Sequence, residues 1–124
     1  MKELKVKSLK VQKSKVYYEC LLWVGLVTET PKTFAGLHLS KQLVRSGTSV
    51  ALNYGEAQAR ESKRDFIHKM KIVLKELRET FICLKILRKT KLFKNENKMI
   101  AISSECNELI SIFVSSLKTV NSKL

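Results

Sequence analysis

Apolar residues recur along this chain in steps of three and four, the spacing that places them on one side of an α-helix. The pattern predicts four helices. The first runs from about Leu9 to Thr28 and stops before Pro31, because the residue preceding a proline is driven out of the α region. The second runs from about Gly36 to Gln58, and its middle is rich in small residues that would let a neighbouring helix approach closely.

The third and fourth helices show the most regular patterns. The third is expected from about Ser62 to Lys91, with Ser62 as N-cap and Asp65 three positions later. The fourth is expected from about Asn95 to the C-terminus. Regular seams joined by short connections predict one all-α domain over residues 1–124, an antiparallel up-down-up-down four-helix bundle. Residues 1–8 are expected to form a mobile basic tail.

Charges on the third helix separate onto different faces. On a helical wheel, six cations fall within roughly 60° of one another, on a face separate from both the apolar seam and the acidic residues. They span roughly 40 Å, which is enough to follow several phosphates. The alternative is a solvated face that only aids solubility. The six candidate nucleic-acid-binding residues are Arg60, Arg64, Lys71, Lys75, Arg78 and Lys89.

The distribution of charge favours the binding interpretation. The chain has 24 Lys and Arg against 11 Asp and Glu, a net charge of +13. The excess is confined to residues 1–15, with six Lys and one Glu, and residues 60–94, with twelve basic and four acidic groups. Localised positive charge attracts polyanions, so RNA or DNA is the expected partner.

Three apolar residues of the third helix lie away from its main seam. They are Ile72, Cys83 and Ile86, and a second buried surface in a homo-oligomer would explain them. The alternative is that they are scattered surface apolar residues, which are common.

Few residues point to catalysis. The chain has no Gly-rich phosphate loop, zinc spacing or nucleophile elbow, and Asp65 with His68 lacks the second pair that a bundle metal site requires. Ser49, Asn53 and Glu56 share one stripe of the second helix. They could form a small catalytic cluster, but interhelical hydrogen bonding is the favoured interpretation, with a basic residue of the third helix as the partner of Glu56. We expect no enzyme activity, no cofactor, no metal and no small-molecule substrate.

The cysteines and the first apolar stretch bear on location. Cys20, Cys83 and Cys106 each lie among apolar residues without metal-like spacing, as expected for reduced thiols of a cytoplasmic protein. The apolar stretch from Val16 to Val27 contains Glu19 and is too short to span a bilayer.

The stretch QLVRSGTSVALNYGEAQARESKRDFIHKMKIVLKELRETFICLKIL, residues 42–87, resembles the bacterial four helix bundle protein family. That family includes proteins encoded in intervening sequences of large-subunit ribosomal RNA genes and, more distantly, the accessory variability determinants of diversity-generating retroelements. The chain departs from the family pattern at Gly55, where a basic residue is common, and at Cys83, where an aromatic residue is common.

The resemblance implies an up-down-up-down bundle that assembles as a ring-shaped homopentamer. Such a ring would repeat the basic stripe and bind RNA or DNA through phosphates with little base reading. In the retroelement relatives a basic ring looks like a partner of a reverse transcriptase and its RNA. The alternative function is a protein-interaction scaffold whose basic face docks an acidic protein partner.

Overall fold

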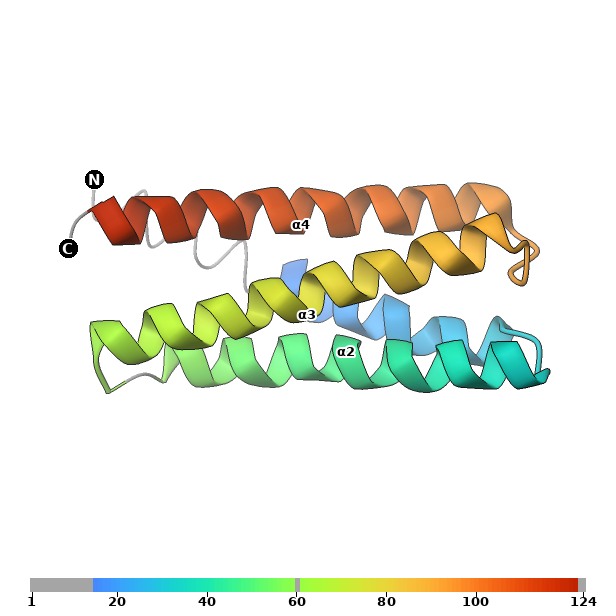
Figure 1. The fold of residues 1–124 in the computed structure, drawn as a ribbon, viewed down its shortest axis with the longest axis horizontal. Coiled ribbons are helices and arrows are strands. Elements are labelled where there is room, and N and C mark those ends of the chain that lie inside the picture. The colour runs from blue at the N-terminus through green and yellow to red at the C-terminus, as the bar shows by residue number, and fades with distance from the viewer. Residues whose placement is uncertain (1–14, 60, 123–124) are drawn as a thin grey trace.

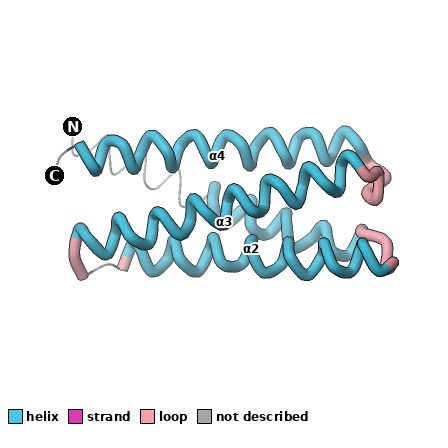
Figure 2. Tube along the Cα trace, in the orientation of Figure 1, coloured by secondary structure: helices cyan, strands magenta, loops and turns pink. Residues whose placement is uncertain are grey.

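The computed structural model describes residues 15–59 and 61–122, and almost all of them are helical (Figures 1 and 2). In chain order the elements are a first helix over residues 15–25, the 3-10 helix η1 (Leu26–Glu29), α2 (Phe34–Gln58), α3 (Lys63–Lys89) and α4 (Glu96–Ser122). Short connections reverse the chain between consecutive helices, so neighbours run antiparallel. The predicted all-α four-helix bundle is confirmed. The part of the predicted tail and first helix that precedes residue 15 lies outside the described residues.

The helix ends follow from polar side chains at their N-caps. The Ser62 hydroxyl accepts a hydrogen bond from the Asp65 backbone N–H at 3.1 Å, which confirms the predicted cap of α3. Asn95 does the same before α4, where its side-chain oxygen accepts from the Lys98 backbone N–H at 3.1 Å. Each bond satisfies one of the backbone donors that a helix start leaves without an intrahelical partner.

The core runs along the whole bundle axis. The predicted seams of α3 and α4 are buried except toward their ends, where Phe66 and Val120 are half-buried. Trp23, Tyr54 and Phe113 are among the largest fully buried side chains of the core. Tyr54 and Phe113 meet edge to face, with ring centroids 5.5 Å apart. The buried residues form one cluster drawn from all four helices, so the described chain folds around a single core.

Small residues on α2 allow close approach, as predicted. A methyl group placed on Gly47 would lie 3.4 Å from a ring carbon of Trp23, in contact with the first helix. One placed on Gly36 would lie 1.9 Å from the Pro31 carbonyl oxygen, an overlap that no side chain can accommodate without backbone movement. Gly36 therefore holds the turn between the first helix and α2 close against the start of α2.

Helix α4 is long and apolar enough, by length and composition alone, to cross a membrane over residues 96–121. A third of an apolar 18-residue window within this range is buried in the bundle. The apolar seam itself is buried: Met99, Cys106, Leu109 and Phe113 are fully covered by the other helices. Packing in the core of the bundle therefore accounts for the apolar seam of α4.

Candidate polyanion-binding face

A groove of about 810 Å³ runs along the surface between α2 and α3. Its floor is apolar and its edges are charged. Along α3, the cations come in the turns 71–78 and the apolar residues mainly in the turns 82–86. The groove is lined from α2 by His38, Leu39, Gln42 and Arg45, and from α3 by Lys71, Leu74, Lys75, Arg78, Glu79, Ile82, Cys83 and Ile86.

The predicted basic stripe is exposed wherever the structure describes it. Lys71, Lys75 and Arg78 line the groove, while Arg64 lies in the first turn of α3 and Lys89 is its last residue. Arg60 is outside the described residues. None of the five described cations forms a salt bridge with any carboxylate in residues 15–59 or 61–122. Arg64 to Lys89 extends roughly 38 Å along the helix.

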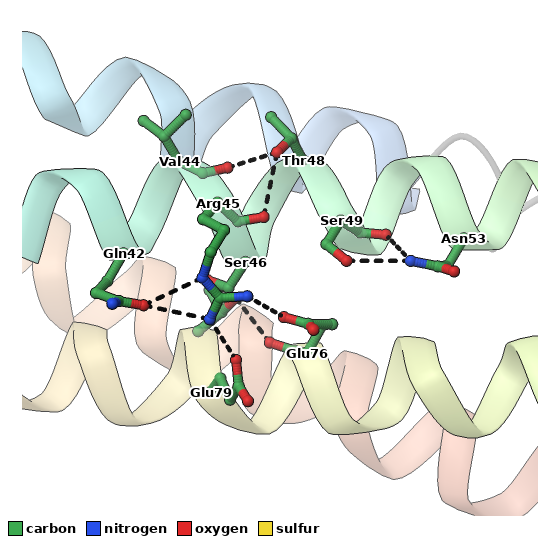
Figure 3. A network of polar contacts seen from close by, with 10 residues as sticks. Gln42, Val44, Arg45, Ser46, Thr48, Ser49, Asn53, Glu76 and Glu79 are labelled. Atoms are coloured by element: carbon green, nitrogen blue, oxygen red, sulfur yellow. Dashed lines mark hydrogen bonds and ion pairs between the residues drawn. The ribbon is translucent and has the colours of Figure 1, made fainter.

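Arg45 behaves differently, because its charge is used within the bundle (Figure 3). One guanidinium nitrogen donates to a carboxylate oxygen of Glu79 at 2.7 Å, and another approaches Glu76 at 3.5 Å. Gln42, one turn earlier on α2, accepts two further hydrogen bonds from the same guanidinium at 3.2 and 3.3 Å. This network ties α2 to α3 and fixes one wall of the groove.

The network also separates the pKa values of its two carboxyl groups. The hydrogen bond from Arg45 lowers the pKa of Glu79, which therefore stays ionised. Burial raises the pKa of Glu76, which is 8% exposed, and the neighbouring charge of Glu79 adds to that shift. The hydrogen bond to Glu79 raises the pKa of Arg45 in turn. Arg45 thus offsets two adjacent negative charges and has little charge left for a ligand.

Ser49, Asn53 and Glu56 were predicted to form interhelical contacts, and only Glu56 does so. Glu56 forms an ion pair with Lys69 of α3, which confirms the expected interhelical partner. The interhelical prediction is wrong for the other two, because the Asn53 amide donates to the Ser49 carbonyl oxygen at 2.9 Å and to its hydroxyl at 3.0 Å, within α2 (Figure 3). The buried interhelical hydrogen bond comes instead from Thr80, whose hydroxyl lies 2.8 Å from that of Ser46.

The three residues proposed for an oligomer interface differ in accessibility. Ile86 is 41% exposed and Ile72 is half-buried. Cys83 is 6% exposed, and its thiol lies 3.5 Å from the Leu39 carbonyl oxygen of α2. Cys83 therefore does not lie on an outer face as expected, because α2 already covers it in the single chain. The wheel did not show this because it considers α3 without its neighbours.

The described residues comprise buried cysteines and a groove lined by charged and apolar side chains. No group of three or more His, Cys, Asp or Glu side chains that could hold a metal ion occurs in the described part of the chain. Cys20, Cys83 and Cys106 are free, and burial raises the pKa of each thiol, to about 12, 11 and 12. These thiols remain protonated near neutral pH and are weak nucleophiles. What the groove offers a ligand is positive charge beside an apolar floor.

Two features of this face were not identified from the sequence. Arg45, Glu76 and Glu79 lie within the stretch that carries the family resemblance but were not singled out, although the two glutamates are spaced i, i+3 on one side of α3. Ile82 was not singled out, yet it is 53% exposed and lines the groove. Its position became meaningful only once α2 was placed beside it.

Comparison with known proteins matches the chain to a family model and to solved structures. The family model described as 23S rRNA-intervening sequence protein matches residues 7–115. Among solved structures, the chain is similar to a protein of unknown function from the S23 ribosomal protein family of Bacteroides thetaiotaomicron. The two are 32% identical, with 90% of this chain and 98% of that chain covered and a TM-score of 0.80. No curated protein was found to match the chain.

Proposed function

Because the chain belongs to the 23S rRNA-intervening sequence protein family, we propose that it binds RNA or DNA through phosphate contacts. In this proposal it acts in the cytoplasm as a non-enzymatic homo-oligomer, a pentameric ring being favoured. The family description names a ribosomal RNA context, which makes RNA the first ligand to test. No residue is assigned a catalytic role.

One observation carries the proposal: the five described cations of the basic stripe form no salt bridge with any carboxylate of the described chain. Ion pairs elsewhere on the bundle show that carboxylates are available, since Lys15, Lys69 and Lys98 each have one. A cation whose charge is not neutralised locally displaces counterions from a phosphate backbone at no cost in broken ion pairs. Lys71, Lys75 and Arg78 lie close together on two turns and form the centre of the proposed site.

The geometry supports contact with the backbone of the nucleic acid over reading of its bases. The cations are spread along one straight helix, with Arg64 and Lys89 at its ends. Exposed aromatic residues, on which single-stranded bases stack, do not accompany them along α3, where Phe66 and Phe81 are half-buried. Assembly into a ring with Ile72 of α3 in the interface between protomers would repeat the basic line on each protomer and raise affinity by multivalency.

The test is a charge-reversal series measured with a structured RNA at several salt concentrations. We expect K71E/K75E/R78E to weaken binding strongly at low salt and to reduce the slope of log K against log salt by about three. A matched control, K32E/K41E/K118E, makes the same change in net charge at exposed positions outside α3. Equal losses in the two variants would show that only overall charge matters and would contradict the proposed site. Circular dichroism and light scattering would establish that both variants fold and assemble.

A further inference from the structure

The groove between α2 and α3 has a property that phosphate binding does not use. Its floor is apolar, with Leu39 and Leu74 half-buried and Ile82 and Ile86 exposed by 53% and 41%. Phosphate contacts use cationic and hydrogen-bonding side chains, and unpaired bases stack on aromatic rings or guanidinium planes. The floor therefore calls for a ligand that buries aliphatic surface.

The groove is also graded along its length. Lys71, Lys75 and Arg78 supply positive charge at one end, and Ile82 with Ile86 supply aliphatic surface at the other. Lys71 and Ile86 are separated by roughly 22 Å along α3. This length matches about four turns of a second helix laid beside α2 and α3.

The α2 side of the groove adds little positive charge for a ligand. Arg45 contributes little free charge because Glu79 and Glu76 already bind it. The net positive charge of the groove thus comes from Lys71, Lys75 and Arg78, on the α3 side only. A ligand with its acidic groups clustered in two adjacent turns would meet all three.

We propose that this groove docks an amphipathic helix of a partner protein, with acidic side chains toward Lys71, Lys75 and Arg78 and aliphatic side chains toward Ile82. The charge complementarity selects an acidic segment as the occupant, because Lys71, Lys75 and Arg78 line one end of the groove. The partner helix and a nucleic acid share the three cations, so they compete for this face. Only the helix contacts Ile82, which makes the two ligands separable by mutation.

The experiment uses two fluorescein-labelled peptides of about 16 residues, long enough to span the groove as a helix. One places Glu in its first two turns and Leu at helical spacing in its last two; the other has the same composition in scrambled order. Anisotropy titrations with the full chain should show the ordered peptide binding at least about tenfold more tightly than the scrambled one. Ile82→Ser should weaken the ordered peptide by about tenfold, the worth of one buried aliphatic side chain.

The same variant separates this inference from the proposed function. Ile82→Ser should leave RNA affinity within about twofold of wild type, whereas K71E/K75E/R78E should weaken both ligands. Equal binding of the two peptides, no peptide binding, or peptide affinity unchanged by Ile82→Ser would each overturn the docking proposal. If Ile82→Ser weakened RNA as much as peptide, nucleic acid would be the occupant of the groove. Failure of RNA to bind while the ordered peptide still does would instead reject the proposed function alone.

Discussion

Two polar clusters tie the helices of this bundle together, and they are built in opposite ways. Between α2 and α3, Arg45 lies between two carboxylates and Gln42 completes its hydrogen bonds. Between the first helix and α4, Glu19 is 2% exposed and faces Glu105, a group of the same charge sign. One cluster brings opposite charges together at the edge of the bundle, and the other brings two carboxyl groups together inside it.

Because the second cluster consists of two carboxyl groups, it avoids charge repulsion by keeping one of them protonated. Burial raises the pKa of Glu19 to about 8, and a hydrogen bond to Glu105 together with its charge adds to the shift. The Glu19 carboxyl is therefore protonated and neutral at moderate pH, and it donates a hydrogen bond to Glu105. One Glu19 carboxylate oxygen still has no hydrogen-bond partner among the described residues, nor do the Trp23 indole nitrogen and the Ser103 hydroxyl. All three lie on the first helix or α4, so the free-energy penalty for burying polar groups without hydrogen bonds falls mainly on this side of the bundle.

The largest expected effect is a fall in stability with rising pH caused by Glu19. Its pKa is about 8 in the folded chain against an ordinary value of 4.5, so over that interval the folded state holds a proton that the unfolded chain releases. The contribution is complete below about pH 4.5 and is lost as pH rises through 8, which amounts to roughly 3 to 5 kcal/mol. Urea unfolding at pH 5 and pH 9 measures it.

Glu19→Gln is the control for this prediction. The amide keeps a donor for Glu105 and cannot ionise, so the variant should gain on the wild type as pH rises and be close to it at pH 5. If the stability difference between the two proteins did not change with pH, Glu19 would not be the titrating group.

Arg45→Met should have the next largest effect, with the opposite dependence on pH. Without the guanidinium, Glu76 and Glu79 repel each other with no cation between them, so the thermal midpoint should fall at pH 7. Arg45 lowers the pKa of Glu79, so its stabilisation is present at neutral pH and is lost as acid protonates that carboxylate below pH 4.5. The destabilisation should therefore shrink between pH 7 and pH 3, and a constant difference would contradict the pairing.

Thr80→Val tests the uncharged contact beside that network. The Thr80 hydroxyl lies within hydrogen-bond distance of the Ser46 hydroxyl and of the Glu76 carbonyl oxygen, and it is fully buried. We expect a loss of about 1 to 2 kcal/mol in the free energy of unfolding, because Ser46 loses its partner across the interface. Thr48→Val, at an exposed position of α2, is the matched control and should cost less than about 0.5 kcal/mol. Equal losses would mean that the methyl substitution, and not the buried bond, is being measured.

The smallest effect is expected at the exposed pair of Lys69 and Glu56. Both side chains remain in contact with water, at 34% and 58% exposure, so solvent screens the pair. Lys69→Ala should change the free energy of unfolding by about 0.5 kcal/mol or less, and the effect should vanish in high salt. A loss as large as that of Thr80→Val would show that this ion pair contributes more than its exposure indicates.

Much of the fold was predictable because it depends on local spacing. Met99, Leu109 and Phe113 recur at helical intervals, so their shared burial follows from periodicity alone. The cap at Ser62 was predictable for a similar reason, since it involves residues three positions apart. The exposure of the cations on α3 also followed, because one face of a helix must point to water.

The candidate site was harder to predict, as two residues show. Cys83 was placed on an outer face by its angle on α3, but α2 passes over it and its thiol meets the Leu39 carbonyl oxygen. Ser49 and Asn53 were expected to bond across helices, but each found its partner within α2, one turn away. Helix geometry gives the direction of a side chain, and a second helix decides what it meets there.

By itself, the amino-acid sequence determined the helices, their apolar faces, the family and the concentration of charge on α3. All of these depend on residues a few positions apart or on composition. Only the tertiary structure decided which charges are neutralised: Arg45 reaches Glu76 and Glu79 across 31 and 34 residues, while Lys71, Lys75 and Arg78 have no salt-bridge partner in the described chain. The physical reason is that Coulomb attraction depends on separation in space, which the packing of α2 against α3 sets and sequence spacing does not.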